Sequence, residues 1–475
     1  MAKIYSSLNE IKGELQSGKV TVEKLVKGYL SEIEKNVHLN AFNEVFTDEA
    51  LQRAKEVDDR LKKGTAGKLA GMVIAIKDNI CYKGHKVSAS SKILSNFESI
   101  YSATVVERLL AEDAVIIGRC NCDEFAMGAA NETSYFGPVK NYADNTKVSG
   151  GSSGGSAVAV QAGLCHAAIG TDTGGSVRQP AAFCGTIGFK PTYGRISRHG
   201  LIAYASSFDQ AGPITNSVED AALLLEVMAG ADEYDSTSST RPVPSYATDL
   251  KKSTGKKKIA YLQESISSPG VDKDLKNVLT ATIDKLRAEG HTVTPIAFEH
   301  LNYLVPAYYI LVTAEASSNL SRYDGVHYGY RSPEATDLMS TYKRSRSEGF
   351  GKEVKRRIML GTFVLSAGYY DAYYAKAQKV RRLIQDKTAQ LFKEYDFILT
   401  PTAPGPAYDL GNVETDPVVS YLADIFTVQA SLTGVPAISL PVGNNAGGLP
   451  LGLQLLAKHF NEQELLNFSK YFVEL

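Results

Sequence analysis

Apolar residues near the N-terminus recur with the period of an α-helix. The pattern holds over residues 22–33 and 51–61, and Ser7 with Glu10 forms a capping-box pattern before a shorter apolar stripe. Each stripe covers only one side of its helix, so these helices need a body to pack against. Residues 1–66 are therefore predicted to form an N-terminal helical segment that clamps onto a larger fold.

Beyond residue 70, short apolar runs alternate with helical stripes. GMVIAI, which ends at Ile76, and DAVIIG resemble buried strands, and TVVERLLAED between them has a helical period. KIAYLQ and HTVTPI frame a predicted helix over 275–286 in the same way, and FILTP, AISLP and LPLGLQLL predict further strands near the C-terminus. Strand–helix–strand units favour parallel pairing and helices on both faces. We therefore expect an α/β fold with a large mixed, mostly parallel central sheet.

Composition divides the rest of the chain into regions of one predicted domain, residues 1–475. Residues 67–231 carry the first part of the sheet and two Gly/Ser-rich loops, and 232–258 are polar and lysine-rich, as expected for an exposed connection. Residues 259–475 return to the α/β pattern and include a helical region over 331–395. We interpret the lysine run as a solvated loop rather than a binding patch.

The overall charge limits the classes of partner. The chain of 475 residues has 51 Lys and Arg against 52 Asp and Glu, and a net charge of −1 excludes a highly basic nucleic-acid binder. Its five cysteines are odd in number and form no Cys-x-x-Cys pair, which favours reduced thiols in a cytoplasmic protein. No stretch approaches the ~18 uninterrupted apolar residues of a membrane span.

The segment RCNCDEF could be interpreted as part of a metal site. It places Cys120 and Cys122 beside Asp123 and Glu124. A structural zinc site needs four ligands, and no second Cys/His cluster with that spacing accompanies this one. We therefore predict no bound metal.

Two Gly/Ser-rich segments carry the candidate chemistry. GGSSGGS spans residues 150–156, and TDTGGSVRQP surrounds Ser176. Glycine permits positive φ and lets backbone N–H groups approach a ligand, so such loops can form oxyanion holes. The first loop satisfies G-x-S-x-G, but a polar, turn-like segment precedes it where a nucleophile elbow needs a strand. Phosphate-binding and dinucleotide-binding loop motifs are absent from the sequence.

Lys77 directly follows the predicted strand GMVIAI. Burial at the end of a sheet would lower the pKa of its ammonium and make the neutral amine available as a base. Alternatively, the side chain could extend to solvent or pair with Asp78 or another carboxylate. The residues alone leave both alternatives open.

A strand-end lysine, a loop serine and a second serine on a TGGS turn can supply a base, a bridge and a nucleophile without histidine. The segments KDNI, GGSSGGSAVAV and GTDTGGSVRQPAAFCG resemble the amidase signature family, whose triad is Ser-cisSer-Lys. The resemblance implies the amidase-signature fold, with Ser176 as the nucleophile and Lys77 as the base. It also implies that Ser152 is the bridging serine, in a cis peptide with Gly151. The implied oxyanion hole is formed by Thr173, Gly174 and Gly175.

Longer segments resemble one branch of that family, the A subunits of glutamyl-tRNA(Gln)/aspartyl-tRNA(Asn) amidotransferases. They include DEFAMGAANETSYFGPVKN, SSFDQAGPIT and SRSEGFGKEVKRR. This resemblance implies a heterotrimer with the B and C subunits of such enzymes, in which this chain hydrolyses glutamine and binds no cofactor. The B subunit would use ATP and Mg²⁺ to activate the mischarged tRNA that receives the ammonia.

The same resemblance implies a glutamine clamp formed by Arg357 and Asp424, with Tyr308 alongside. A guanidinium fork suits the substrate α-carboxylate, and a carboxylate suits its α-ammonium group. Without the resemblance, Arg357 would be interpreted as one more cation on a solvated helix face. The loop KVSGGSSGGS departs from many relatives, which have a proline before the two glycines.

Two alternatives to the glutaminase hypothesis remain. A free-standing amidase of a small amide would keep the triad but would need neither Arg357 nor Asp424. A non-catalytic scaffold would not need the triad residues, all three of which are present. The sequence leaves open whether tRNA(Gln), tRNA(Asn) or both would be served.

Overall fold

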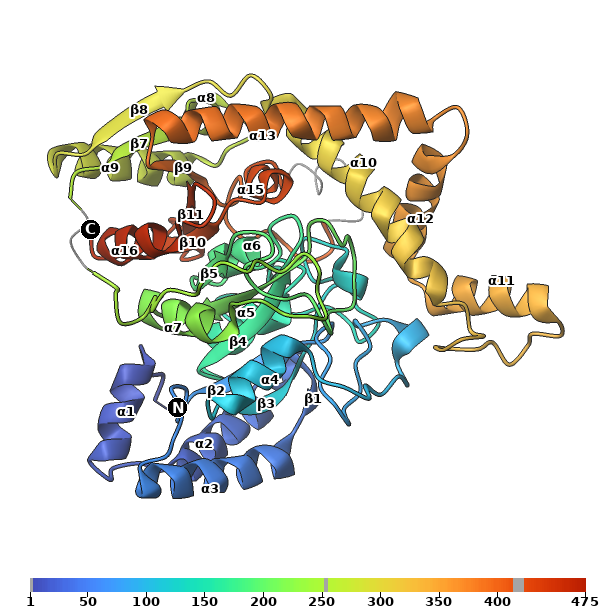
Figure 1. The fold of residues 1–475 in the computed structure, drawn as a ribbon, viewed down its shortest axis with the longest axis horizontal. Coiled ribbons are helices and arrows are strands. Elements are labelled where there is room, and N and C mark those ends of the chain that lie inside the picture. The colour runs from blue at the N-terminus through green and yellow to red at the C-terminus, as the bar shows by residue number, and fades with distance from the viewer. Residues whose placement is uncertain (1–2, 252–254, 413–422) are drawn as a thin grey trace.

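The computed structural model describes residues 3–251, 255–412 and 423–475, which form α-helices around one central sheet (Figure 1). The strands are β1 (Phe42–Val45), β2 (Val73–Lys77), β3 (Val115–Cys120), β4 (Ala167–Asp172), β5 (Ile187–Lys190), β6 (Gln210–Thr215), β7 (Lys258–Leu262), β8 (Thr292–Ile296), β9 (Phe397–Pro401), β10 (Ala437–Asn444) and β11 (Pro450–Ala457). The helices of the first half are α1 (Leu8–Gln16), α2 (Val22–Lys35), α3 (Thr47–Lys63), α4 (Thr104–Ala111), α5 (Gly154–Gln161), α6 (Arg178–Phe183) and α7 (Val218–Met228). The later helices are α8 (Glu264–Ser267), α9 (Lys273–Ala288), α10 (Leu301–Asn319), α11 (Leu338–Gly349), α12 (Lys352–Leu365), α13 (Lys376–Glu394), α15 (Val428–Thr433) and α16 (Glu462–Phe472).

The sheet is mixed, as predicted. Within the described residues its strand order is β1-β3-β2-β4-β6-β5-β10-β11-β9-β7-β8. The two strand–helix–strand units identified in the sequence give the parallel pairs β2/β3 and β7/β8. The middle of the sheet is antiparallel, so the expectation of a mostly parallel sheet was wrong: four of the ten described pairings are parallel and six are antiparallel.

One antiparallel pair at the centre of the sheet has a local cause. β10 and β11 form a hairpin closed by residues 445–449, where the amide of Asn445 donates to the carbonyl of Leu449 at 2.8 Å. β6 lies between β4 and β5 and runs antiparallel to both. The short connection between β10 and β11 favours antiparallel pairing, whereas parallel pairing requires a long crossover. Longer segments of the chain separate β6 from β4 and β5.

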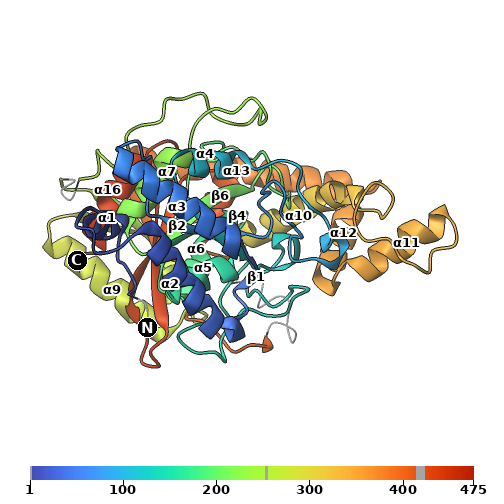
Figure 2. The same ribbon diagram turned by 90° about the horizontal axis from the view of Figure 1, so that it is seen from below.

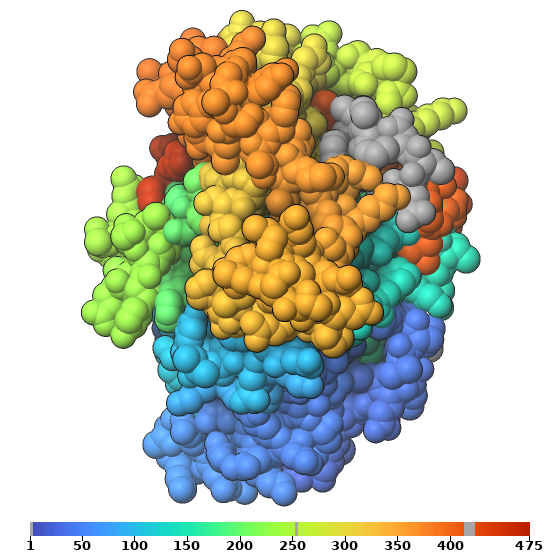
Figure 3. All heavy atoms as spheres, turned by 90° about the vertical axis from the view of Figure 1, so that its right-hand side faces the viewer, coloured from blue at the N-terminus to red at the C-terminus, as the bar shows by residue number. Residues whose placement is uncertain are grey.

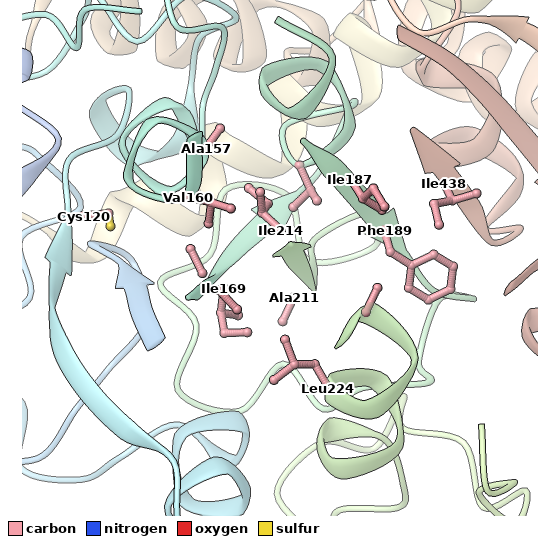
Figure 4. Close-up of a cluster of buried hydrophobic side chains, with 14 of the residues drawn as sticks. Cys120, Ala157, Val160, Ile169, Ile187, Phe189, Ala211, Ile214, Leu224 and Ile438 are labelled. Atoms are coloured by element: carbon pink, nitrogen blue, oxygen red, sulfur yellow. The ribbon is translucent and has the colours of Figure 1, made fainter. Parts of the chain in front are cut away.

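Helices cover both faces of the sheet, as predicted. In Figure 4, Ala157 and Val160 of α5 lie on one side of β4 and β6, and Leu224 of α7 lies on the other side. Ile169 of β4 and Ile214 of β6 are fully buried between them. The strands are apolar on both faces because both faces are covered.

The N-terminal segment is helical but also supplies a strand that the sequence did not reveal. β1 pairs antiparallel with β3 at one edge of the sheet. α1 begins after Ser7 as predicted, but the capping box is absent: the Ser7 side chain makes no capping bond, and Glu10 accepts the amide of Ser6 at 2.9 Å. The capping-box prediction was therefore wrong because the acid reaches one residue further back.

The predicted helical region over 331–395 forms α11, α12, a short π-helical turn (Tyr370–Ala375) and α13. α12 packs along α10, and α13 packs against α10 and α15. Figures 1 and 2 both show α11 protruding from the body at one end of the long axis. No helix within the described residues is long and apolar enough to cross a membrane.

Candidate active site

Lys77 is the last residue of β2 and is 0% exposed. Its Nζ donates to Ser152 Oγ at 2.7 Å, to Ser153 Oγ at 3.0 Å and to Thr171 Oγ1 at 3.0 Å. Burial lowers the pKa of Lys77 to about 8, and nearby carboxylates offset only part of this effect. A solvated Lys77 is excluded because the side chain is fully buried. A pair with Asp78 is excluded because Asp78 pairs with Arg119 instead.

Ser152 lies in the loop that precedes α5. The Gly151–Ser152 peptide bond is cis, as the resemblance implied. A Cβ at Gly151 would lie 2.1 Å from Asp123 Oδ2, so only glycine fits there. The Gly151 amide donates to Gln179 Oε1 at 2.9 Å, and the Ser152 carbonyl accepts the amide of Asp123 at 3.2 Å. The loop is therefore fixed on both sides of the serine.

Ser176 follows the turn that leaves β4 and is 8% exposed. Its carbonyl accepts the Ser153 amide at 3.2 Å, which joins the two serine loops. A Cβ at Gly174 would lie 2.3 Å from Tyr308 Oη, and Gly175 has a φ of +137°. Within the described residues, the amides of Thr173, Gly174 and Gly175 donate to no acceptor. This turn therefore presents N–H groups that could donate hydrogen bonds to an oxyanion.

A buried ion pair holds the turn that bears Ser176. Arg178 Nε and Nη2 donate to the two carboxylate oxygens of Asp172, each at 3.0 Å. Although burial disfavours the ionised form of Asp172, the guanidinium holds the pKa of this carboxyl below its usual value. Arg178 also donates to the carbonyl of Thr427 at 2.9 Å and to Gln454 Oε1 at 3.0 Å. The pair thus ties the turn to β11 and to the start of α15.

The three predicted clamp residues lie in one cluster. Arg357 of α12 is 5% exposed, so the alternative of a solvated helix face was wrong. Its Cζ lies 5.4 Å from the ring centroid of Tyr309, whose hydroxyl donates to Asp424 Oδ2 at 2.9 Å. Burial raises the pKa of Asp424 to about 7. Tyr308, which contacts Gly174, joins this cluster to the turn before Ser176.

A protein-family model described as Amidase matches residues 24–466. The chain belongs to the amidase family. The A subunit of a glutamyl-tRNA(Gln) amidotransferase from Chlorobium phaeobacteroides is 52% identical over 467 residues, which cover 98% of each chain. The crystal structure of the protein of the same name from Thermotoga maritima has a TM-score of 0.79 at 39% identity, covering 95% of this chain and 91% of that one.

Peptide amidase from Stenotrophomonas maltophilia also has this amidase fold. Its structure has a TM-score of 0.82 at 29% identity and covers 98% of this chain and 95% of that one. An enzyme named for peptide amides thus matches the fold as well as the Thermotoga protein does. The fold therefore positions amidase chemistry without selecting its substrate.

The amidase site contains residues that sequence reasoning missed. Tyr309 binds Asp424, and the hydroxyl of Tyr204 accepts from Arg357 Nη1 at 2.8 Å. Thr171 and Ser153 share the Lys77 ammonium. Tyr309 directly follows the predicted Tyr308 in α10, and this proximity was a signal that it lies near the site. Nothing in the sequence around Tyr204 indicated a contact with α12.

The cysteines considered for a metal site are packed among other contacts. Cys120 and Cys122 are both buried, and Asp123 accepts the amide of Asn131 at 2.9 Å. Glu124 accepts the amide of Gly351 at 2.9 Å. Across the described ranges, no group of three or more His, Cys, Asp or Glu side chains is placed to hold a metal ion.

Proposed function

We propose that this amidase is the glutamine-hydrolysing A subunit of a glutamyl-tRNA(Gln)/aspartyl-tRNA(Asn) amidotransferase. The observation that carries the proposal is the position of a guanidinium and a carboxylate, Arg357 and Asp424, beside the turn that bears Ser176. Tyr308 links the turn that bears Ser176 to the cluster of Arg357 and Asp424. Its hydroxyl lies against Gly174 of the turn, and its ring packs edge-to-face at 5.1 Å on Tyr309, which belongs to the cluster. The named relatives, at about half identity over nearly the full chain, support the same function.

The triad performs acyl transfer. Neutral Lys77 accepts the proton of Ser152, Ser152 accepts that of Ser176, and Ser176 Oγ attacks the side-chain amide carbon of glutamine. The oxyanion accepts hydrogen bonds from the N–H groups of residues 173–175, and each such donor typically stabilises the transition state by ~3 to 4 kcal/mol. Protonation of the leaving nitrogen releases ammonia and leaves a γ-glutamyl ester on Ser176. Water hydrolyses the ester to glutamate and restores the serine.

The substrate is held by its amino-acid end. Arg357 binds the α-carboxylate and ionised Asp424 binds the α-ammonium group, while the Tyr308 ring forms part of the wall between this end and the amide. A simple amide lacks both charged groups. The clamp therefore gives glutamine a large advantage over a simple amide, and a free-standing amidase would have no use for it.

The ammonia then passes to a partner. The B subunit converts the mischarged tRNA with ATP and Mg²⁺, and the C subunit joins the two, so this chain itself needs no cofactor. Support for a partner comes from the exposed large apolar side chains of residues 359–383, named here the α12–α13 patch: Met359, Leu360, Phe363, Leu365, Tyr369, Tyr370, Tyr373 and Leu383. The rings of Phe363, Tyr369 and Tyr373 lie against one another. Large apolar side chains exposed in one region of the chain are typical of a protein–protein contact surface.

The charge around the α12–α13 patch favours one class of occupant. Residues 338–394 contain thirteen Lys and Arg but five Asp and Glu, in a chain whose net charge is −1. Figure 3 views the end of the molecule that carries α11 and α12. An apolar face with an acidic rim, presented by a partner protein, complements this surface.

A substrate panel tests the function. Ammonia release is measured for glutamine, asparagine and propionamide, with the chain alone and co-purified with its partners. The proposal expects kcat/KM for glutamine to exceed that for propionamide by at least about 10²-fold, the value of a desolvated charge pair. Strong, partner-independent turnover of propionamide, with no preference for glutamine, would overturn it in favour of a free-standing amidase.

A further inference from the structure

Asp209 is buried between the two halves of the site without belonging to either of them. It precedes β6 and is 5% exposed. One carboxylate oxygen, Oδ1, accepts from the hydroxyl of Thr173 at 2.6 Å. The other, Oδ2, accepts the amides of Tyr204 at 2.8 Å and Ala205 at 3.0 Å. One side chain therefore holds both the turn before Ser176 and residues 204–205 of its own loop.

Tyr204 continues the connection to the clamp. Its hydroxyl accepts from Arg357 Nη1 at 2.8 Å, and the guanidinium lies 5.6 Å from the centre of its ring. A run of short hydrogen bonds thus leads from Thr173 through Asp209 and Tyr204 to Arg357. The same loop makes a second contact with the site, because Phe208 packs edge-to-face on Tyr308 at 5.8 Å.

The energetics make this connection stiff. A buried carboxylate is stable only when its hydrogen bonds are complete, and bonds to an ionised acceptor are roughly twice as strong as neutral ones. Asp209 accepts three such bonds from two segments that are separated in sequence. Moving either segment would break hydrogen bonds to a buried carboxylate.

We propose that Asp209 is a positioning residue that fixes the oxyanion turn and the glutamine-binding Arg357 relative to each other. The inference rests on the proposed glutaminase function. Glutamine spans both sites with one flexible side chain, so its amide reaches Ser176 in a reactive geometry only if the two sites keep their separation. A misplacement of ~1 Å at such a site can cost about 10²-fold in rate.

A split between kcat and KM tests the proposal. Thr173→Val disturbs the oxyanion end and should lower kcat about tenfold with little change in KM for glutamine. Tyr204→Phe disturbs the clamp end and should raise KM about tenfold with little change in kcat. Asp209→Ala should change both, so that kcat/KM falls on the order of 10²-fold or more.

A pH profile gives a second readout that a merely structural role would not change. Burial raises the pKa of Asp209 to about 6, and Glu315 adds to the effect. The charge of Asp209 also influences the pKa of Lys77 and of Tyr193. Below that pH the carboxyl gains a proton and loses acceptor capacity, so kcat should fall and KM should rise. Asp424, whose pKa is raised to about 7, also titrates in this range, so the readout is the difference from the wild type. Asp209→Asn, which keeps the shape and cannot titrate, should lack the component near pH 6.

Tyr193→Phe is the matched control. It removes a 2.8 Å hydrogen bond to the carbonyl of Ser206 in the same loop but leaves the Asp209 bonds intact, so it should be near wild type. The proposal is overturned if Asp209→Ala alters only one kinetic parameter, or if Asp209→Asn keeps the step near pH 6. If Asp209→Ala does not fold, Asp209→Asn decides. A wild-type chain that does not hydrolyse glutamine would instead refute the proposed function.

Discussion

The two ends of the proposed site are built in different ways: the nucleophile end, which bears Lys77, Ser152 and Ser176, and the clamp end, which bears Arg357, Tyr308 and Asp424. Lys77, Ser152 and Ser176 lie at the ends of central strands or in the loops next to them, and each is buried. Arg357 and Tyr308 lie on helices, and Asp424 precedes α15. In the proposed function, the chemistry is thus placed by the sheet and its loops, whereas recognition comes from helices at its side. Substrate choice can then change without disturbing the nucleophile.

Removing the nucleophile should have the largest effect. Ser176→Ala is expected to lower kcat for glutamine by about 10⁴-fold or more, as when other catalytic serines are removed. Because the clamp is untouched, glutamine should bind with unchanged affinity in calorimetry. Ser153→Ala is the control within the same loop system, and its loss should be far smaller. An equal loss in the two variants would contradict the assignment of the nucleophile.

The base should be the next most sensitive position. Lys77→Ala is expected to reduce kcat by about 10³-fold, within the range of general-base removal. Because burial lowers the pKa of Lys77 to about 8 and the neutral amine is the base, kcat/KM of the wild type should rise with pH and level off above about 8. Two results together would remove lysine from the mechanism. They are a wild-type kcat/KM that is flat from pH 6 to 9, and near-normal activity in a Lys77→Ala protein with normal thermal unfolding.

Disturbing the clamp should have a smaller effect, confined to amino-acid substrates. Arg357→Ala is expected to raise KM for glutamine about 10²-fold, because the substrate α-carboxylate loses its buried partner. Propionamide turnover should not change. Arg356→Ala is the matched control, because Arg356 pairs with the same Glu353 as Arg357 but from the exposed side of α12. An unchanged KM in Arg357→Ala would refute the clamp.

The smallest effect on the isolated chain is expected at the α12–α13 patch. Met359→Ser and Phe363→Ser should leave glutaminase activity of the chain alone unchanged but weaken its association with the co-expressed B and C subunits at least tenfold. Ile100→Ser, at an 82% exposed apolar residue elsewhere on the surface, is the control. Equal association of all three variants, measured by analytical ultracentrifugation, would remove the patch from the interface.

The two ends of the site also differ in how far the sequence predicts them. The strands around Lys77 and Ser176 are short apolar runs, and this local pattern suffices to predict them as buried strands. The family resemblance supplied the triad residues. The clamp residues came from the resemblance alone, because burial of Arg357 depends on how α12 rotates against α10. Tyr204 and Asp209 could not be predicted, since their contacts depend on an irregular loop whose path is set by tertiary packing.

The sheet shows the same limit. Strand–helix–strand patterns predicted the parallel pairs at β2/β3 and β7/β8, but the central strands pair with partners distant in sequence. β5 pairs with β10, which follows it by more than two hundred residues. Periodicity reports which residues are buried, not which strands are neighbours.

The account depends most directly on a γ-glutamyl ester at Ser176. The decisive measurement is acid quenching of the wild type with glutamine during an ammonia burst equal to the enzyme concentration, followed by peptide mapping by mass spectrometry. The account predicts one γ-glutamyl group on the peptide that contains Ser176, and none in Ser176→Ala. A γ-glutamyl group on Ser152 or Ser153, or an ammonia burst without any acylated peptide, would contradict it.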